Sequence, residues 1–380
     1  MVTSVGFDNK RITVGAERTD QYLPLLEGKR VAVVANQTSV FNDAHLVDVL
    51  IAKGVDLKKV FAPEHGFRGV ADAGELLQDG KDKKTGKPVI SLYGKNKKPT
   101  AEQLTDVDVV VFDIQDVGAR FYTYISSMHY VMEACAEQGK QFIVLDRPNP
   151  NGFYVDGPIL EEDEKSFVGM HPVPIVHGMT VGEYAQMING EEWLKNGAQC
   201  ELNVISCMGY DHDSSYELPI PPSPNLPNMS AIYLYPTLCL FEGTYLSVGR
   251  GTDKQFQIIG APNLEVGSFR FTPESMQGAK HPKHEGQECR GFDLGTFGEF
   301  YMRNTRRIYL FWLLNIYKAL NEEERAKLFD PFFDKLAGTT KLREQIQQGK
   351  SEEEIIASWA DGLAAFKEVR SKYLLYKDFK

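Results

Sequence analysis

The chain has 380 residues, which is enough for one large domain or two domains of medium size. Hydrophobic residues make up 42% of it and charged residues 25%, an ordinary balance that argues against a disordered protein. The net charge of −10 argues against a nucleic-acid-binding surface, and it means that locally placed arginines must hold any anionic ligand. The sequence contains no apolar run of about 18 residues, so we expect no membrane-spanning helix.

The N-terminus and the cysteines bear on the cellular compartment of the protein. The first ten residues, MVTSVGFDNK, lack the basic region and apolar core of a signal peptide. We therefore expect a cytoplasmic protein, or a periplasmic or secreted one if a leader has been removed. The five cysteines form no CxxC pair, which predicts buried thiols instead of a zinc knuckle or a disulfide framework.

Strand and helix patterns alternate through the first 150 residues. Strands are predicted at residues 29–37, 58–66, 107–118 and 140–150, and helices at 44–54 and 121–139. The apolar runs of the strands are continuous instead of alternating, as in sheets that are buried on both faces. The first half therefore predicts an α/β fold with a parallel sheet covered by helices.

The second half is less regular and becomes mostly helical near its end. A helix is predicted at 180–190, a strand at 199–206, and an extended loop at 219–229, where prolines exclude helix and central strand. Further helices are predicted at 306–320, 322–338, 340–350 and 351–376. Ser351 and Glu354 have the spacing of a capping box at the start of the last helix. We expect a domain boundary between about residues 150 and 170.

Each of the four strands in the first half ends in a polar and specific sequence. These endings occupy residues 36–39, 63–69, 113–120 and 146–150. Ligands of parallel α/β sheets bind at the carboxyl ends of the strands, where such loops converge. The sequence therefore predicts a functional site at this edge of the sheet.

A nucleotide cofactor is not expected at that edge. The first strand is followed by NQTSV at residues 36–40, which has no glycine where a dinucleotide site needs GxGxxG. The phosphate-binding pattern GxxxxGK[ST] is absent from the sequence as well.

Glu64 is the strongest candidate for acid–base chemistry. It lies between Pro63 and Gly66 at the end of a buried strand, where partial desolvation suits a general acid near neutral pH. The alternative is a structural carboxylate that pairs with Arg68 or caps a helix. His65 could orient Glu64, bind substrate or make an ordinary loop hydrogen bond.

Two aspartates follow the third predicted strand. Asp113 and Asp116 are three residues apart, so a turn is needed before both can line one site. Metal binding has little support, because no HxH, HExxH or clustered-aspartate pattern is present. Asp113 could instead accept backbone N–H groups at the sheet edge.

Four arginines lie beside turns that contain glycine, proline or an acidic residue. Arginine binds carboxylates and phosphates in bidentate fashion, so we expect at least two of the four to contact an anionic ligand. Each of them could instead form a structural ion pair. The four are Arg68, Arg120, Arg147 and Arg250.

Aromatic and glycine-rich segments supply further candidates. Tyr122 and Tyr124 could pack on a sugar face or donate hydrogen bonds, although core packing is equally expected. Glu242 precedes a glycine, and Arg250 lies between two glycines that let backbone line a pocket. The segment PPSPNLP at residues 221–227 would form a stiff wall beside it.

Several of these motifs, in this order, resemble the NamZ-type exo-β-N-acetylmuramidases of glycoside hydrolase family 171. The motifs are PEHGFRG (63–69), DIQDVGARFYTY (113–124), DRPNP (146–150), PPSPNLP (221–227) and the segment 241–262. The resemblance implies a Rossmann-like catalytic domain over residues 1–160 and a smaller α+β auxiliary domain with a helical C-terminus over residues 161–380. It places the site in a cleft between them.

The resemblance also implies a bacterial enzyme of cell-wall recycling that releases N-acetylmuramic acid from the non-reducing end of peptidoglycan fragments. Glu64 would then be the catalytic acid, with Glu242 or Asp116 as its partner unless the 2-acetamido group of the sugar serves instead. The lactyl carboxylate and the sugar ring would contact His65, Arg68, Asp113, Arg120, Tyr122, Tyr124, Arg147, Asn149, Asn225 and Arg250. No cofactor is implied.

Two other functions remain open from the residues alone. The first is a metal-dependent hydrolase of phosphate or amide bonds that uses Glu64, His65, Asp113 and Asp116. The second is a non-catalytic protein that binds peptidoglycan sugars, because a cleft beside a sheet also serves binding.

Overall fold

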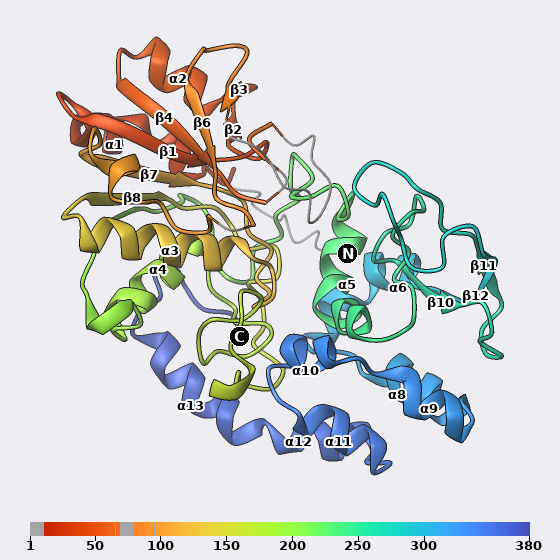
Figure 1. The fold of residues 1–380 in the computed structure, drawn as a ribbon. Coiled ribbons are helices and arrows are strands. Elements are labelled where there is room, and N and C mark those ends of the chain that lie inside the picture. The colour runs from red at the N-terminus through yellow and green to blue at the C-terminus, as the bar shows by residue number, and fades with distance from the viewer. Residues whose placement is uncertain (1–10, 65, 69–79, 95) are drawn as a thin grey trace, which may run out of the picture.

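A computed structural model describes residues 11–64, 66–68, 80–94 and 96–380 of the chain. Two halves lie side by side in it (Figure 1). The first half contains a seven-stranded sheet, and the second contains a three-stranded sheet together with most of the helices. His65 lies outside the described residues.

The large sheet has the strand order β5-β6-β4-β1-β7-β8-β9. Neighbouring strands are parallel except β5 and β6, which pair antiparallel at one edge. The predicted parallel sheet is therefore confirmed, although the short strands β5 and β6 were not predicted. The strands are β1 Arg30–Ala35, β4 Asp56–Ala62, β5 Gly80–Lys81, β6 Pro88–Ser91, β7 Val109–Asp113, β8 Gln141–Leu145 and β9 Glu201–Ile205.

Helices cover both faces of this sheet, as the continuous apolar runs of the strands require. On one face Val31 and Val33 belong to a core with residues of α1 (Thr19–Leu26) and α2 (Leu46–Ala52). On the other face the alternate residues Ala32 and Val34 pack with α3 (Tyr124–Glu137) and α4 (Val181–Gly190). Consecutive positions in the middle of β1 are thus apolar, because alternate side chains enter two different cores.

The last strand of the sheet comes from far along the chain. β9 pairs parallel with β8, with Gln141 opposite Glu201, after a long segment that is mostly irregular apart from α4. The boundary predicted near residue 160 therefore falls inside the segment that leads to this strand. The sequence pattern could not show this, because nothing in an isolated strand tells which sheet it joins. Short elements of this half are η1 Gly15–Glu17, β2 Val40–Phe41, β3 Ala44–His45, η2 Glu102–Leu104, η3 Glu162–Glu164 and η4 Lys195–Gly197.

The second half begins with α5 (Met229–Leu238) and is built from a small antiparallel sheet and short helices. The sheet has the order β10-β12-β11, with β10 Ile258–Ala261, β11 Phe269–Phe271 and β12 Cys289–Asp293. This half has the α+β character that was predicted for it. Its other elements are η5 Cys239–Gly243, α6 Gly295–Phe300, α7 Met302–Thr305, α8 Phe311–Ala319, α9 Glu322–Leu328, α10 Pro331–Ala337, α11 Lys341–Gln347, α12 Glu352–Ser358 and α13 Ala360–Ser371.

Two of the long C-terminal helices that were predicted are each divided in two. The pattern at 322–338 breaks between α9 and α10, where Asp330 caps the N–H of Phe332 and Pro331 begins the new helix. The pattern at 351–376 breaks at Trp359. The capping box of Ser351 and Glu354 is confirmed, since each side chain accepts the backbone N–H of the other.

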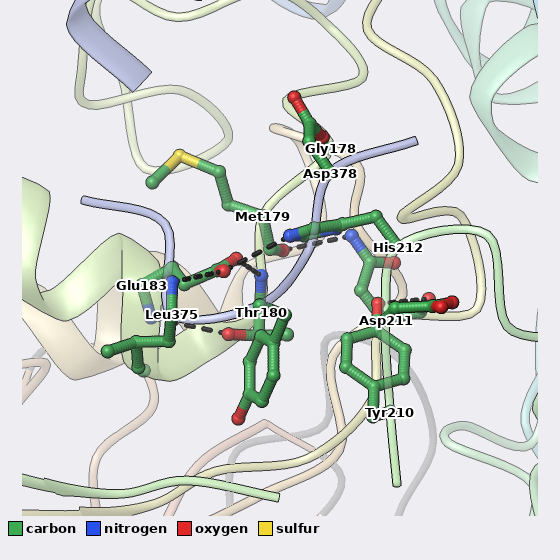
Figure 2. Close-up of polar contacts among 12 residues, drawn as sticks. Gly178, Met179, Thr180, Glu183, Tyr210, Asp211, His212, Leu375 and Asp378 are labelled. Carbon is green, nitrogen blue, oxygen red and sulfur yellow. Dashed lines mark hydrogen bonds and ion pairs between the residues drawn. The ribbon is translucent and has the colours of Figure 1, made fainter. Parts of the chain in front are cut away.

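The C-terminal residues return to the first half of the molecule (Figure 1). The Tyr376 hydroxyl lies 2.6 Å from Oδ2 of Asp146, which follows β8, and it accepts the backbone N–H of Cys207. Figure 2 shows the neighbouring contacts, in which Glu183 of α4 accepts the N–H of Leu375 and contacts the ring of His212. The end of the chain is thus fastened to the large sheet.

The cysteines and the helix lengths bear on two of the predictions made from composition. All five cysteines are buried and free, as predicted. Among the described residues, no helix is long and apolar enough to span a membrane.

Candidate active site

A cavity of about 250 Å³ is lined by residues from both halves of the molecule. Its first wall is formed by residues that follow strands of the large sheet, and its second by the proline-rich loop, α5, η5 and α10. The lining residues are Glu64, Tyr93, Phe121, Tyr122, Thr123, Tyr124, Phe167, Val168, Ser223, Asn225, Leu226, Tyr235, Cys239, Glu242, Arg250, Phe256, Phe332 and Leu336.

The first wall lies at the carboxyl edge of the sheet, where the site was predicted. Glu64 follows β4, Tyr93 follows β6, and the segment 121–124 leads from β7 into α3. These three strands are parallel, so the chain leaves all of them at the same edge. Segments that are distant in sequence therefore meet around one cavity.

Glu64 is held at the cavity by neighbouring hydroxyl groups. The Thr123 hydroxyl donates a hydrogen bond to Oε2 of Glu64 at 2.9 Å. Burial raises the pKa of Tyr93 to about 12, and the nearby Glu64 carboxylate and its hydrogen bond to Tyr93 add to this shift. Tyr93 therefore remains protonated at neutral pH and acts as a second hydroxyl donor to Glu64.

The second wall carries another carboxylate, but it is already paired. Arg250 contacts Glu242 with two nitrogens, at 2.5 Å from Nε to Oε1 and 2.9 Å from Nη2 to Oε2. The same guanidinium lies 5.0 Å from the centre of the Phe256 ring. Glu242 and Arg250 thus line the cavity as a bidentate ion pair.

The proline-rich loop is fixed against the aromatic wall. The hydroxyls of Tyr122 and Tyr124 both donate to the carbonyl of Pro222, at 2.9 and 3.3 Å. Asn225 donates through Nδ2 to the carbonyl of Gly278 at 2.8 Å. Its Oδ1 is buried and has no partner in the described part of the chain, so it can accept a hydrogen bond from a ligand in the cavity.

Arg147 and Asp113, which were expected to contact substrate, do not line the cavity. They form a buried pair, with Nε of Arg147 2.6 Å from Oδ1 of Asp113 and Nη2 3.0 Å from Oδ2. Asn149 is also occupied internally, because its side chain donates to the carbonyl of Met179 and accepts the N–H of Asn151. These polar groups hold the turns after β7 and β8 together.

Arg120 and Arg68, which were also expected to contact substrate, do not line the cavity and are engaged with other groups of the protein. Arg120 is buried and donates to the carbonyls of Pro158, Val173, Leu336 and Ala337, and burial lowers its pKa to about 9. Arg68 pairs with Asp82 and approaches Asp48. Of the four arginines, Arg250 is the one that lines the cavity.

Asp116 is buried beside the cavity and is not part of its lining. Burial raises its pKa to about 7, while the N–H groups of Gly118 and Val117 oppose that shift. Its Oδ2 accepts the N–H of Gly118 at 2.6 Å. Asp116, expected as a possible second catalytic carboxylate, is thus not among the lining residues, whereas Glu64 and Glu242 both are.

The sequence did not single out several residues of the lining. Thr123 had a usable signal, since it lies between the two tyrosines of a motif already noted. Tyr93, Phe167, Tyr235 and Phe332 had none, because isolated aromatic residues in a sequence look the same whether they enter a core or a cavity.

A family model described as the N-terminal part of exo-β-N-acetylmuramidase NamZ matches residues 31–230, and one for the C-terminal part matches residues 233–376. This chain belongs to the NamZ family. The two models meet at the start of α5, where the chain passes from one wall of the cavity to the other.

Relatives of the NamZ family cover nearly the whole chain. The peptidoglycan β-N-acetylmuramidase NamZ of Bacillus subtilis is 40% identical over 376 residues, which are 93% of this chain and 89% of that protein. A crystal structure of a DUF1343 family protein from Bacteroides fragilis is 46% identical, with a TM-score of 0.90 over 97% of this chain and all of that one. A second from the same organism is 32% identical, with a TM-score of 0.83 over 97% of this chain and 99% of that one.

Proposed function

We propose that this protein is a glycoside hydrolase that releases N-acetylmuramic acid from the non-reducing end of peptidoglycan fragments. The observation that carries the proposal is Glu64, a carboxylate oriented by Thr123 and Tyr93 in the wall of a cavity of about 250 Å³. A cavity of this size is below the range typical of sites for drug-sized ligands and suits a single sugar residue. The relative from Bacillus subtilis is named a peptidoglycan β-N-acetylmuramidase, which supports the proposal.

Glu64 is proposed as the general acid. In its protonated form it would transfer its proton to the glycosidic oxygen as the bond from that oxygen to the anomeric carbon breaks. Water then supplies a hydroxyl group to the anomeric carbon, and the remaining proton restores Glu64. Thr123 and Tyr93 keep the carboxyl group aimed at one place during this cycle.

The other walls supply recognition of the sugar. Tyr122, Tyr235 and Phe256 line the cavity with aromatic surface, on which the apolar face of a pyranose ring can pack. The unpaired Oδ1 of Asn225 suits the N–H of the 2-acetamido group. Glu242 is available as a second carboxylate provided that it gives up a contact with Arg250, and the acetamido group of the substrate is the alternative.

Replacing Glu64 by glutamine tests this role. Glu64→Gln keeps the shape of the side chain but removes the acidic proton, so kcat on a chromogenic β-N-acetylmuramide should fall by about 10²-fold or more. Thr123→Val, which removes one orienting hydrogen bond, should cause a smaller loss. The thermal transitions of both variants should stay close to that of the original protein.

Three outcomes would count against the proposal. Full activity of Glu64→Gln would remove Glu64 from the chemistry. Binding of N-acetylmuramic acid without turnover, before and after the substitution, would favour a sugar-binding protein. Loss of turnover on treatment with a chelator would favour the metal-dependent hydrolase.

A further inference from the structure

We propose that Lys97 recognises the lactyl carboxylate of the sugar in the cavity and thereby sets specificity for muramic acid. This inference rests on the proposed function and adds a residue to it. Lys97 belongs to the loop that follows β6, the same loop that brings Tyr93 to Glu64.

Lys97 is not itself a lining residue, but its ammonium lies over the ring of one that is. Its Nζ lies 4.1 Å from the centre of the Phe167 ring, and Phe167 lines the cavity. The carbonyl of Phe167 accepts a hydrogen bond of 2.7 Å from Ser126 of α3, which fixes the segment that carries the ring. A cation–π contact of this kind holds an ammonium group in place without neutralising its charge.

The charge of Lys97 is not paired inside the protein. The next residue, Lys98, contacts Glu133 and Glu137 of α3 at 2.7 Å each. Lys97 makes no ion pair with any carboxylate in the part of the chain that the structure describes. Two adjacent lysines therefore have different roles, since one fastens the loop to α3 and the other leaves its charge beside the cavity.

The charged residues of the cavity lining leave a place for an additional cation such as Lys97. Glu64 and Glu242 are both acidic, and Arg250 is neutralised by Glu242. A sugar that carries a carboxylate would therefore meet a net negative charge if no further cation were near. Lys283 lies close to Glu242, but its ammonium already donates to the backbone carbonyls of Glu242 and Thr244.

A lysine side chain also suits the chemistry of the lactyl carboxylate. The lactyl ether ends in a carboxylate on a short rotatable arm, and a lysine stem with three rotatable donors can follow it. A charge-assisted hydrogen bond at a partly buried position is strong enough to separate a sugar with this group from one without it.

The experiment compares two substrates in four proteins, which are the original, Lys97→Met, Lys97→Arg and Lys98→Met. The substrates are a chromogenic β-N-acetylmuramide and the same compound with its lactyl carboxylate converted to a neutral amide. Lys97→Met should lower kcat/KM on the acid by about tenfold and leave kcat/KM on the amide nearly unchanged. Lys98→Met is the matched control, because it removes a neighbouring charge that is already paired, and it should keep the preference for the acid.

The outcomes separate this inference from the proposed function. If the unmodified protein hydrolyses neither compound, the proposed function fails. If it hydrolyses the acid and Lys97→Met keeps the same preference, Lys97 is not the recognising group and the inference fails alone. An equal loss on both substrates would also overturn it, because it would indicate a structural role, whereas recovery of the preference in Lys97→Arg would support it.

Discussion

Buried charges in this protein hold the chain together more often than they face the cavity. The ion pair of Asp113 and Arg147 is the clearest case, since the side-chain exposures of its members are 2% for arginine and 0% for aspartate. Removing one member leaves the other as an uncompensated buried charge, which costs about 3–5 kcal/mol. A comparable pair at the surface contributes about 0–1 kcal/mol.

We therefore predict that Arg147→Met lowers the free energy of unfolding by about 3–5 kcal/mol, measured by urea denaturation. Arg270→Met serves as the control, because Arg270 pairs with Glu288 while both side chains are 61% exposed. It should change stability by about 1 kcal/mol or less. A similar small loss for Arg147→Met would contradict the prediction.

A buried histidine makes stability depend on pH. Burial lowers the pKa of His177 to about 3, and the nearby charges of Arg370 and Arg120 act in the same direction. The unfolded chain takes up this proton at about pH 6.5, whereas the folded protein does not. The neutral ring therefore stabilises the fold fully above about pH 6.5, and this contribution is lost as the pH falls towards 3.

The variant His177→Asn should remove the pH-dependent contribution of His177 to stability. The side-chain oxygen of the asparagine can still accept the N–H of Met179. We predict that the stability of the original protein relative to the variant declines between pH 6.5 and 4.5, by up to about 1.4 kcal/mol per pH unit. Urea denaturation at several pH values measures the difference. Other titrating groups are shared by both proteins, so parallel curves would show that His177 does not contribute.

At the scale of elements, Tyr376 attaches the C-terminal segment to the large sheet. Tyr376 donates to Asp146 and accepts from Cys207, and burial raises the pKa of Asp146 to about 6. Tyr376→Phe keeps the ring but withdraws a donor from a buried carboxyl group, so we predict a loss of about 1–2 kcal/mol by urea denaturation. Tyr373→Phe is the control, since its hydroxyl contacts Glu191 in a more open position. Its loss should be smaller.

The elements that could be predicted from the sequence are mainly those whose buried residues form a clear apolar pattern. The strands β1, β7 and β8 were predicted because each contains a continuous apolar run, and β4 and β9 because each has apolar residues near its carboxyl end. The break between α9 and α10 was missed because Asp330 and Pro331 interrupt an apolar pattern that continues on both sides. The strands β5 and β6 are too short to give a pattern, and no strand was predicted for the short elements β10 to β12.

The candidate site was predictable in part for a similar reason. Glu64, Tyr122, Tyr124, Asn225, Glu242 and Arg250 stand in distinctive motifs and reach the cavity. Asp113, Arg120 and Arg147 stand in equally distinctive motifs, but their partners are carbonyls and carboxylates of other loops. A sequence motif shows which charged residues stand out, whereas the partner of each one depends on the three-dimensional packing.

At the scale of the whole molecule, Arg120 is one direct link between the two halves, behind the cavity lining. It leaves the sheet after β7 and binds the carbonyls at the end of α10, so it connects one wall of the cavity to the other. Neither half contains all of the lining residues. The relative position of Glu64 and Arg250 is therefore a property of the assembled pair.

The return of the C-terminal segment to the large sheet has a consequence for biosynthesis. Every strand of that sheet has been made once the ribosome has passed residue 205, yet Asp146 still lacks its tyrosine partner. Thr180 and Gly182 already donate to this carboxyl group, but its third side of contact, the Tyr376 hydroxyl, is added only after residue 376 has emerged. Translation of the entire second half thus precedes completion of the first.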